Sequence, residues 1–210
     1  MIGIIDYGMG NLFSVSKALE RLDAPYFISE DKDRLLQADA LILPGVGAFK
    51  DAMEKLKKTG LSEMISVFVD SGRPLLGICL GMQLLFESSE EYGYSEGLNL
   101  LPGKVVRFPG ITGDGTAYKV PHMGWNKLHF KRESLVTPDL NDDFVYFVHS
   151  YYAETKEDVI IASCSYDKEV PAVVGRNNVF GMQFHPEKSS KLGMQLLSNF
   201  ANLIQKGKTR

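Results

Sequence analysis

The sequence has 210 residues, 44% hydrophobic and 23% charged, with a formal net charge of −3. This length suits one domain with a substantial core, and the small charge gives no reason to expect a surface for nucleic acid or an anionic membrane. The longest apolar runs are strand-sized, the N-terminus lacks the basic start of a signal peptide, and two cysteines make no disulfide framework. We therefore expect a cytoplasmic protein.

The first third of the chain predicts alternating strands and helices. Apolar runs indicate short strands at 2–6, 26–28 and 40–43, and apolar residues at helical spacing indicate a helix after Asn11. The turn at 7–11 contains Gly-x-Gly and resembles a phosphate-binding loop, but no Gly-x-x-Gly continuation follows, so the signal is weak.

The third strand runs into Pro44-Gly45-Val46-Gly47-Ala48-Phe49, which leads to an amphipathic helix. Its glycines permit peptide planes to point either way, and the carboxyl end of a strand is where α/β folds place ligand sites. A flexible structural turn is the plainer interpretation. Its place beside the motif described next favours an oxyanion loop, with an N–H donor near Val46.

Residues 74–86 contain the most informative motif. An apolar run after Pro74 predicts a buried parallel strand, and a helix is expected from Leu80 onward. Between them, Gly77-Ile78-Cys79-Leu80-Gly81 is a Gly-x-Cys-x-Gly form of the nucleophile elbow. Such a turn exposes the Cys79 sulfur at the end of the sheet, and the helix N-terminus favours its thiolate. The backbone N–H of Leu80 is placed to donate to an oxyanion. A buried structural cysteine is the alternative.

The middle of the chain gives weaker signals. A helix at 61–69 closes at Gly72, and the polar loop at 88–93 either binds an ammonium group or is simply solvated. A strand is expected at 103–108. Trp125 is the only tryptophan, and it is either a core residue or an aromatic anchor at a protein interface.

The last third predicts further strands and a final helix. Strands are expected at 144–148 and 159–166, a hairpin around Asn177-Asn178, and a helix at 190–205. Cys164 falls on the apolar face of its strand, so we interpret it as a small core residue.

His185-Pro186-Glu187 follows the hairpin and supplies a base and a carboxylate. In an extended segment the side chains of His185 and Glu187 emerge on the same side, and Pro186 disfavours helix. A base followed by the acid that orients it is what a thiol nucleophile needs. His149 is a rival base, but no acid lies two residues after it. A structural histidine is the alternative.

These motifs together resemble a known family. The elbow with Cys79 and the later His185-Pro186-Glu187 resemble the class I (triad) glutamine amidotransferases. The resemblance narrows to the family of glutaminase subunits of imidazole glycerol phosphate synthase, and six segments spread over the chain support it: Asp6–Leu12, Pro44–Phe49, Gly77–Gln83, Pro121–Asn126, Tyr146–Tyr151 and His185–Ser189.

The resemblance implies a fold and a reaction. The fold would be a single α/β, flavodoxin-like amidotransferase domain over residues 1–210, with a mostly parallel central sheet flanked by helices. Cys79 would attack the side-chain amide of glutamine, His185 would protonate the departing ammonia, and Glu187 would orient His185. The thioester would then be hydrolysed to glutamate. No cofactor or metal is implied.

The resemblance also assigns supporting residues and a partner. The oxyanion hole would use the N–H groups of Val46 and Leu80, the former after a peptide flip. Glutamine would be held by Gly47, Gln83, Glu91, Ser150 and Tyr151. The partner would be a separate (β/α)8 barrel cyclase, which uses the ammonia to form imidazole glycerol phosphate and AICAR in histidine biosynthesis. It would dock around Asn11, Trp125, Tyr146 and Lys188.

Three other interpretations stay open on the sequence. The same glutaminase chemistry could serve a related synthase-like amidotransferase, for example one that amidates a surface-sugar precursor. A non-enzymatic regulatory or binding module could use the same scaffold, but it would need no working triad. A cysteine hydrolase or protease is the third, and its substrate would distinguish it.

Overall fold

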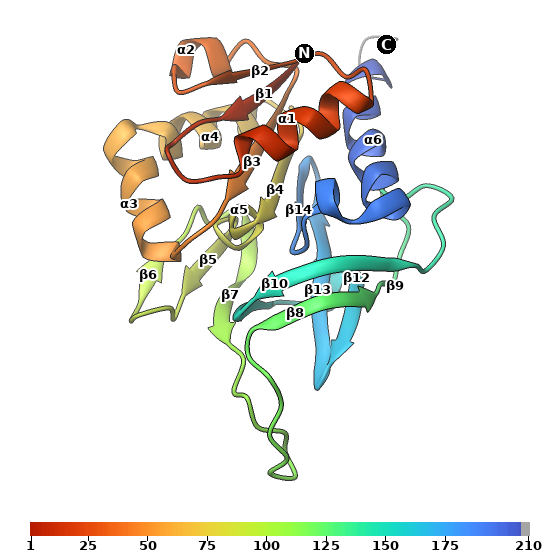
Figure 1. Ribbon diagram of the computed structural model, residues 1–210. Coiled ribbons are helices and arrows are strands. Elements are labelled where there is room, and N and C mark those ends of the chain that lie inside the picture. The colour runs from red at the N-terminus through yellow and green to blue at the C-terminus, as the bar shows by residue number, and fades with distance from the viewer. Residues whose placement is uncertain (207–210) are drawn as a thin grey trace.

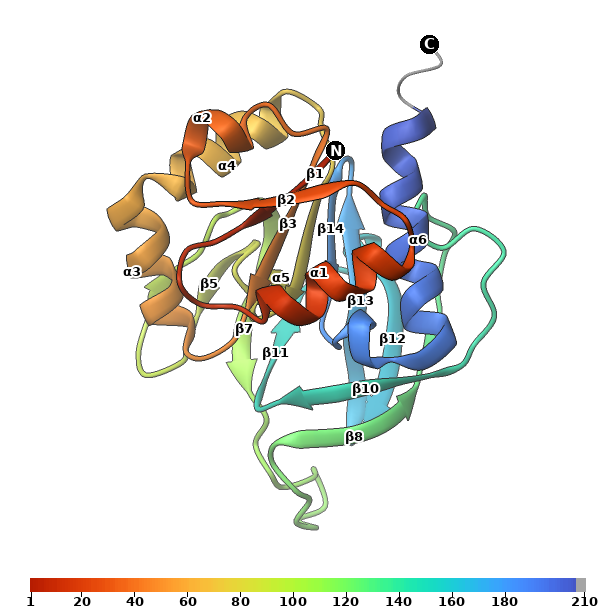
Figure 2. The ribbon, with the colours of Figure 1, turned by 45° about the horizontal axis from the view of Figure 1, so that its top comes forward.

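The computed structural model describes residues 1–206, and a mixed sheet runs through the centre of this part of the chain (Figures 1 and 2). Its strand order is β2-β1-β3-β4-β14-β13-β12-β9. The strand pairs from β2 to β14 are parallel, and those from β14 to β9 are antiparallel. The predicted α/β fold is thus confirmed, with its parallel part at the N-terminal side of the sheet.

The strands of the central sheet are β1 (Ile2–Ile5), β2 (Tyr26–Ser29), β3 (Ala40–Gly45), β4 (Leu75–Cys79), β9 (His129–Phe130), β12 (Ile160–Tyr166), β13 (Lys168–Arg176) and β14 (Val179–Met182). A second sheet has the order β11-β7-β5-β6, with β5 (Phe86–Ser89), β6 (Ser95–Glu96), β7 (Leu101–Arg107) and β11 (Tyr151–Glu154). β8 (His122–Lys127) and β10 (Phe144–His149) form a two-stranded ribbon. The helices are α1 (Leu12–Arg21), α2 (Lys32–Leu35), α3 (Phe49–Thr59), α4 (Leu61–Asp70), α5 (Leu80–Gln83) and α6 (Ser190–Lys206), with 3-10 turns η1 (Glu157–Val159) and η2 (Pro186–Lys188).

Both faces of the sheet are buried at β1, β3, β4 and β14, which explains why these strands are apolar throughout, whereas the edge strand β2 is only partly buried. Helices α1 and α6 cover one face and α3 and α4 the other, as Figure 2 shows. Successive strand residues supply the two cores alternately: in β3, Ile42 packs with the first pair of helices and Leu41 and Leu43 with the second. Cys164 is fully buried in the first core, as predicted.

The helix expected from Leu80 to the end of the elbow stretch is much shorter than predicted. α5 ends at Gln83, and Phe86 begins strand β5, which also contains Ser88 and Ser89 of the expected polar loop. The carbonyls of Leu84 and Leu85 accept N–H groups from the segment 98–101 instead of from a further helical turn. Because these apolar residues are all buried, their periodicity could not separate helix from strand.

His185 and Glu187 were expected in an extended segment, which is confirmed for His185 and wrong for Glu187. Residues 186–188 form the 3-10 turn η2, with Pro186 at its first position, where proline's missing N–H and fixed φ are tolerated. The Lys188 N–H donates to the His185 carbonyl at 3.0 Å and closes the turn.

Within residues 1–206, no helix has both the length and the apolar character needed to cross a membrane. The single domain expected over 1–210 stays a prediction, and its residues 207–210 lie outside the described part of the chain.

Candidate active site

The elbow forms where β4 ends at Cys79 and α5 begins at Leu80. Cys79 has φ 56° and ψ −114°, a strained conformation for a residue with a side chain. The flanking glycines make the turn possible. A Cβ on Gly81 would lie 1.8 Å from the Leu43 carbonyl oxygen, and one on Gly77 would lie 2.5 Å from the Gly81 carbonyl oxygen. The sequence therefore pins Cys79 at the carboxyl end of the sheet.

His185 reaches Cys79 from the end of β14, the strand that pairs with β4. Its Nδ1 lies 2.9 Å from Glu187 Oε1, and the two side chains are only 6% and 2% exposed. Cys79 and His185 line one cavity, and the interaction with Cys79 contributes to the raised pKa of His185. The order is therefore sulfur, imidazole, carboxylate, and the turn η2 brings the carboxylate to the ring.

The surroundings of His185 favour its protonated form. Burial by itself lowers the pKa of His185, but the hydrogen bonds and charge of Cys79 and Glu187 outweigh burial and raise this pKa to about 9. An imidazolium at neutral pH can donate a proton to a leaving group, which is one half of general acid–base catalysis.

A cavity of about 420 Å³ opens over Cys79 and His185. It brings together the predicted nucleophile, base, oxyanion donors and substrate contacts, since its lining includes Val46, Gly47, Cys79, Leu80, Gln83, Glu91, Ser150, Tyr151 and His185. Glu187 lies behind His185. A larger cavity of about 620 Å³ beside β11 and β13 contains none of these residues, so we place the site by its chemistry and not by volume.

Glu91 and Gln83 show how the polar wall of this cavity is held. Glu91 Oε2 accepts the Phe49 N–H at 2.7 Å, at the first turn of α3. Burial raises the pKa of Glu91 despite this bond, so a cation beside it would stabilise its charged form. The Gln83 amide nitrogen donates to the Tyr151 carbonyl and to Gln183 Oε1, both at 3.0 Å.

The loop after β3, which the sequence predicts to be an oxyanion loop, packs on a residue that sequence reasoning missed. The buried Tyr7 hydroxyl donates to the Pro44 carbonyl at 3.0 Å and lies 2.9 Å from the position of a Cβ on Gly45. Burial, and then Cys79, raise the pKa of Tyr7, which therefore stays a neutral donor. Gly47 has φ +100°, while Val46 beside it is 43% exposed. No local spacing in the sequence links residue 7 to the loop.

The predicted docking residues lie on elements near the predicted triad of Cys79, His185 and Glu187. Trp125 and Tyr146 face each other across the β8–β10 ribbon, with Trp125 54% exposed, so the alternative that this tryptophan is a core residue is wrong. Lys188 is exposed at the end of η2, which contacts both β10 and α1. Asn11 has a local task as well, because its side-chain oxygen caps α1 by accepting the Ser14 N–H at 3.2 Å.

Solved structures with low sequence identity share this fold. A crystal structure described as a glutamine amidotransferase has a TM-score of 0.74 and 21% identity, over 98% of each chain. The glutaminase domain of CTPS from Trypanosoma brucei has a TM-score of 0.65 and 16% identity, over 100% of this chain and 94% of that one. At these identities the likeness shows the fold alone.

Other relatives share a much larger part of this amino-acid sequence than these solved structures do. The imidazole glycerol phosphate synthase subunit HisH of Geobacillus thermodenitrificans is 60% identical over 205 residues, 97% of this chain and 96% of that protein. The protein of the same name from Bacillus subtilis is 56% identical over 211 residues and all of both chains. The family model "Glutamine amidotransferase class-I" matches residues 4–203. With a cysteine elbow and a His–Glu pair over one cavity, this chain belongs to the class I glutamine amidotransferases and, among them, to the HisH subunits of imidazole glycerol phosphate synthase.

Proposed function

We propose that this chain hydrolyses glutamine to glutamate and ammonia through a thioester on Cys79 and passes the ammonia to a cyclase subunit. The observation that carries the proposal is the sulfur–imidazole–carboxylate order of Cys79, His185 and Glu187 at the wall of a cavity of about 420 Å³. Family membership supports the same reaction, because the matching relatives are named as subunits of imidazole glycerol phosphate synthase.

In the first half of the reaction, the Cys79 sulfur attacks the side-chain amide carbon of glutamine. His185 carries the proton that leaves with the nitrogen as the carbon–nitrogen bond breaks, so that ammonia departs and a thioester remains. Glu187 keeps the imidazole in place through its 2.9 Å contact with Nδ1. In the second half, His185 takes a proton from water, the water oxygen replaces sulfur on carbon, and glutamate leaves.

The oxyanion of both halves would be held by the N–H groups of Leu80 and Val46. Removal of one such donor costs about 2.7–4 kcal/mol of barrier, or about 10²–10³ in rate. We infer that the Val46 peptide must turn to donate, and that Gly47 permits the turn because it already has a positive φ. The latent state of the free subunit would then be an incomplete oxyanion hole.

The remaining lining residues would hold the amino-acid end of glutamine. The buried Glu91 carboxylate would pair with the α-ammonium group. The pairing would stabilise the carboxylate, because a buried charge needs a partner of opposite sign. Gly47, Gln83, Ser150 and Tyr151 would complete the pocket, the last two from the junction of β10 and β11.

The partner would be a cyclase built as a (β/α)8 barrel, and the exposed apolar face of the ribbon supports a docking site. Met123, Trp125, Phe144 and Val148 are all at least 36% exposed on β8 and β10, and such a cluster is typical of protein interfaces. Asn11, Tyr146 and Lys188 would complete this face. Both cysteines are free thiols, which fits our placement of the reaction in the reducing cytoplasm.

Glutamate release from glutamine, measured for the chain alone and with the barrel cyclase plus its ribonucleotide substrate, tests the proposal. We expect weak activity alone, large stimulation with both, and loss on Cys79→Ala. Activity that ignores the cyclase would indicate another acceptor enzyme. Hydrolysis of small peptides or esters in place of glutamine would indicate a cysteine hydrolase, and no turnover of any substrate would contradict the assignment of Cys79.

A further inference from the structure

The β8–β10 ribbon has two faces of opposite character. Side chains alternate along each strand, so Met123, Trp125 and Val148 point out while His122 and His149 are buried, at 3% and 6% exposure. The two histidines are directly paired across the ribbon. The outer face is the proposed docking surface, and the inner face carries two buried titratable groups for which the proposed mechanism has no use.

These histidines form a continuous hydrogen-bonded chain that ends at the glutamine pocket. His149 Nδ1 lies 2.8 Å from the Tyr151 carbonyl oxygen and must donate to it. His149 Nε2, 2.9 Å from His122 Nδ1, must then accept if both rings are neutral. His122 Nε2 in turn accepts from the Asn126 amide at 3.3 Å, and that amide also donates to the Ser165 carbonyl at 2.8 Å. Each ring is thus fixed in its Nδ1–H tautomer.

The surroundings keep both rings neutral. His122 stacks on Phe147 and Tyr166, with ring centroids 4.6 and 3.9 Å apart. Burial lowers the pKa of His122 to about 4. For His149, burial and the neighbouring His122 outweigh the Tyr151 carbonyl and lower the pKa to about 3. A proton added to either ring would leave two donors facing each other.

At its pocket end, this series of hydrogen bonds holds the Tyr151 carbonyl in the wall of the pocket. The Tyr151 carbonyl accepts from His149 on one side and from Gln83 on the other, at 2.8 and 3.0 Å. Gln83 continues to Gln183, two residues before His185 on the same strand end. His149, Ser150, Tyr151 and Gln83 all line the cavity.

We propose that His122 and His149 are positioning residues for glutamine: as a neutral pair on the inner face of the docking ribbon, they fix the Tyr151 carbonyl and with it the pocket wall. This rests on the proposed function for its kinetic consequence. The ribbon would thus have a second task, because the strands that carry the proposed docking surface also carry the residues that hold the pocket wall.

Two variants of His149 separate hydrogen bonding from packing. His149→Leu removes the donor to the Tyr151 carbonyl, and we expect the KM for glutamine in the stimulated complex to rise about 3- to 10-fold, the effect of one net hydrogen bond. His149→Asn retains an N–H donor near the position of Nδ1, so its KM should stay within about twofold of wild type. His122→Leu should raise KM about threefold, since it releases the tautomer of His149.

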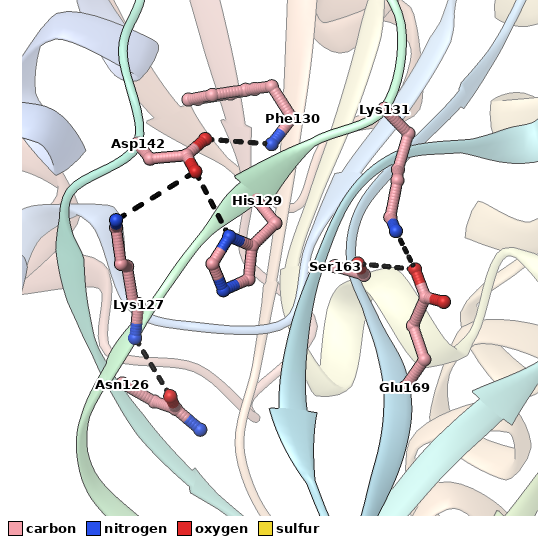
Figure 3. A network of polar contacts seen from close by, with 8 residues as sticks. All are labelled: Asn126, Lys127, His129, Phe130, Lys131, Asp142, Ser163 and Glu169. Atoms are coloured by element: carbon pink, nitrogen blue, oxygen red, sulfur yellow. Dashed lines mark hydrogen bonds and ion pairs between the residues drawn. The ribbon is translucent and has the colours of Figure 1, made fainter.

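The matched control is His129→Asn. His129 is a surface histidine on β9, paired with Asp142 in the network of Figure 3, and it lies outside the cavity lining. We expect its KM and kcat to equal those of wild type. Unchanged kinetics for His149→Leu, in a wild type that turns over glutamine, would overturn the positioning role alone. Equal losses for His149→Leu and His149→Asn would also overturn it, because they would indicate packing.

A second measurement does not depend on turnover or on folded variants. In the intact chain with ¹⁵N-labelled histidine at pH 7, imidazole nitrogen shifts should show His122 and His149 protonated at Nδ1 only. A charged ring, or a proton on Nε2 of either ring, would overturn the inference. Failure of wild-type turnover with the expected tautomers would instead overturn the proposed function and remove the kinetic role of the pair.

Discussion

His185 and His149 lie on the wall of the same cavity and are almost equally buried, at 4% and 6% exposure, yet their protonation is opposite. Burial lowers the pKa of both. Next to His185, Cys79 and Glu187 reverse this effect and raise the pKa to about 9. Next to His149 stand a backbone carbonyl, His122 and two aromatic rings, none of which offers a negative charge, and the pKa falls to about 3. The neighbours of each ring, together with the burial of that ring, decide which histidine can serve as an acid and which can only position other groups.

The largest difference in activity should be that between His185→Asn and His149→Asn, which make the same substitution at the two histidines. His185→Asn removes the group proposed to protonate the leaving ammonia, so we expect glutamate release in the stimulated complex to fall by at least about 10³-fold. His149→Asn should keep kcat within a few-fold. Circular dichroism of both variants checks that they fold. A comparable fall in kcat for His149→Asn would make His149 the working base.

Glu187→Gln tests whether the negative charge beside His185 causes its pKa to differ from that of His149. The amide can still contact Nδ1, but it offers no negative charge, so the pKa of His185 should fall toward that of an ordinary histidine. We expect a loss of about 10²- to 10⁴-fold in kcat, as for the orienting acid of other triads. Imidazole NMR titration gives the pKa directly. An unchanged pKa would show that Cys79 alone sustains it.

Val46→Pro removes a backbone N–H from the other wall of the cavity. We expect stimulated turnover to fall by about 10²–10³, while basal turnover changes little, since the donor is used only after the peptide turns. Gly47 is left intact, so the loop keeps its positive φ. Full stimulation of this variant by the partner-bound ribonucleotide would rule out the latent oxyanion hole.

The two kinds of histidine should also destabilise the fold at opposite ends of the pH scale. The pKa values of His122 and His149, about 4 and 3, lie below the ordinary 6.5, so the unfolded chain binds protons first and stability falls as pH drops from about 6.5 to 4. The raised pKa of His185 contributes stability below pH 6.5 that is lost as pH rises through about 9. Each group adds a slope of up to about 1.4 kcal/mol per pH unit in urea unfolding. A free energy of unfolding that does not change between about pH 6.5 and 4 would contradict the claim that His122 and His149 are neutral in the folded protein.

The smallest effects are expected in the surface network of Figure 3. Lys131 and Glu169 are paired there at 2.6 Å, but their side chains are 45% and 55% exposed. Such pairs contribute about 0–1 kcal/mol, and salt screens them. Lys131→Met should therefore leave both the urea midpoint and the turnover near wild-type values, in contrast to any change at the buried histidines.

Much of the fold could be predicted from sequence because buried parallel strands have a recognisable pattern, an unbroken apolar run with glycines near its end. The elbow could be predicted for the same reason: Gly77 and Gly81 are spaced as close approach to the backbone requires. The apolar stretch after Leu80 was misjudged because residues buried on every side have no informative period. The turn η2 was missed because Pro186 is compatible with both an extended segment and the first position of a turn.

The candidate site was only partly predictable. Proposed site residues that belong to a local motif, such as Cys79 and Glu187, could be identified from that motif alone. His122 and His149 are 27 residues apart and meet across a ribbon whose register depends on tertiary structure. Tyr7 meets Pro44 in the same way, across neighbouring parallel strands. A signal for the histidines did exist in retrospect, since each is a polar residue on the buried side of an alternating strand.

The most direct test of the central claim, that Cys79 is the nucleophile for glutamine, is covalent trapping. A chloroketone analogue of glutamine is added to the wild-type complex, and the modified residue is mapped by mass spectrometry. We expect one adduct, on Cys79, that glutamine suppresses and that Cys79→Ala abolishes, while the fully buried Cys164, whose pKa burial raises to about 12, stays unmodified. An adduct on another residue, or labelling that glutamine does not suppress, would contradict the claim.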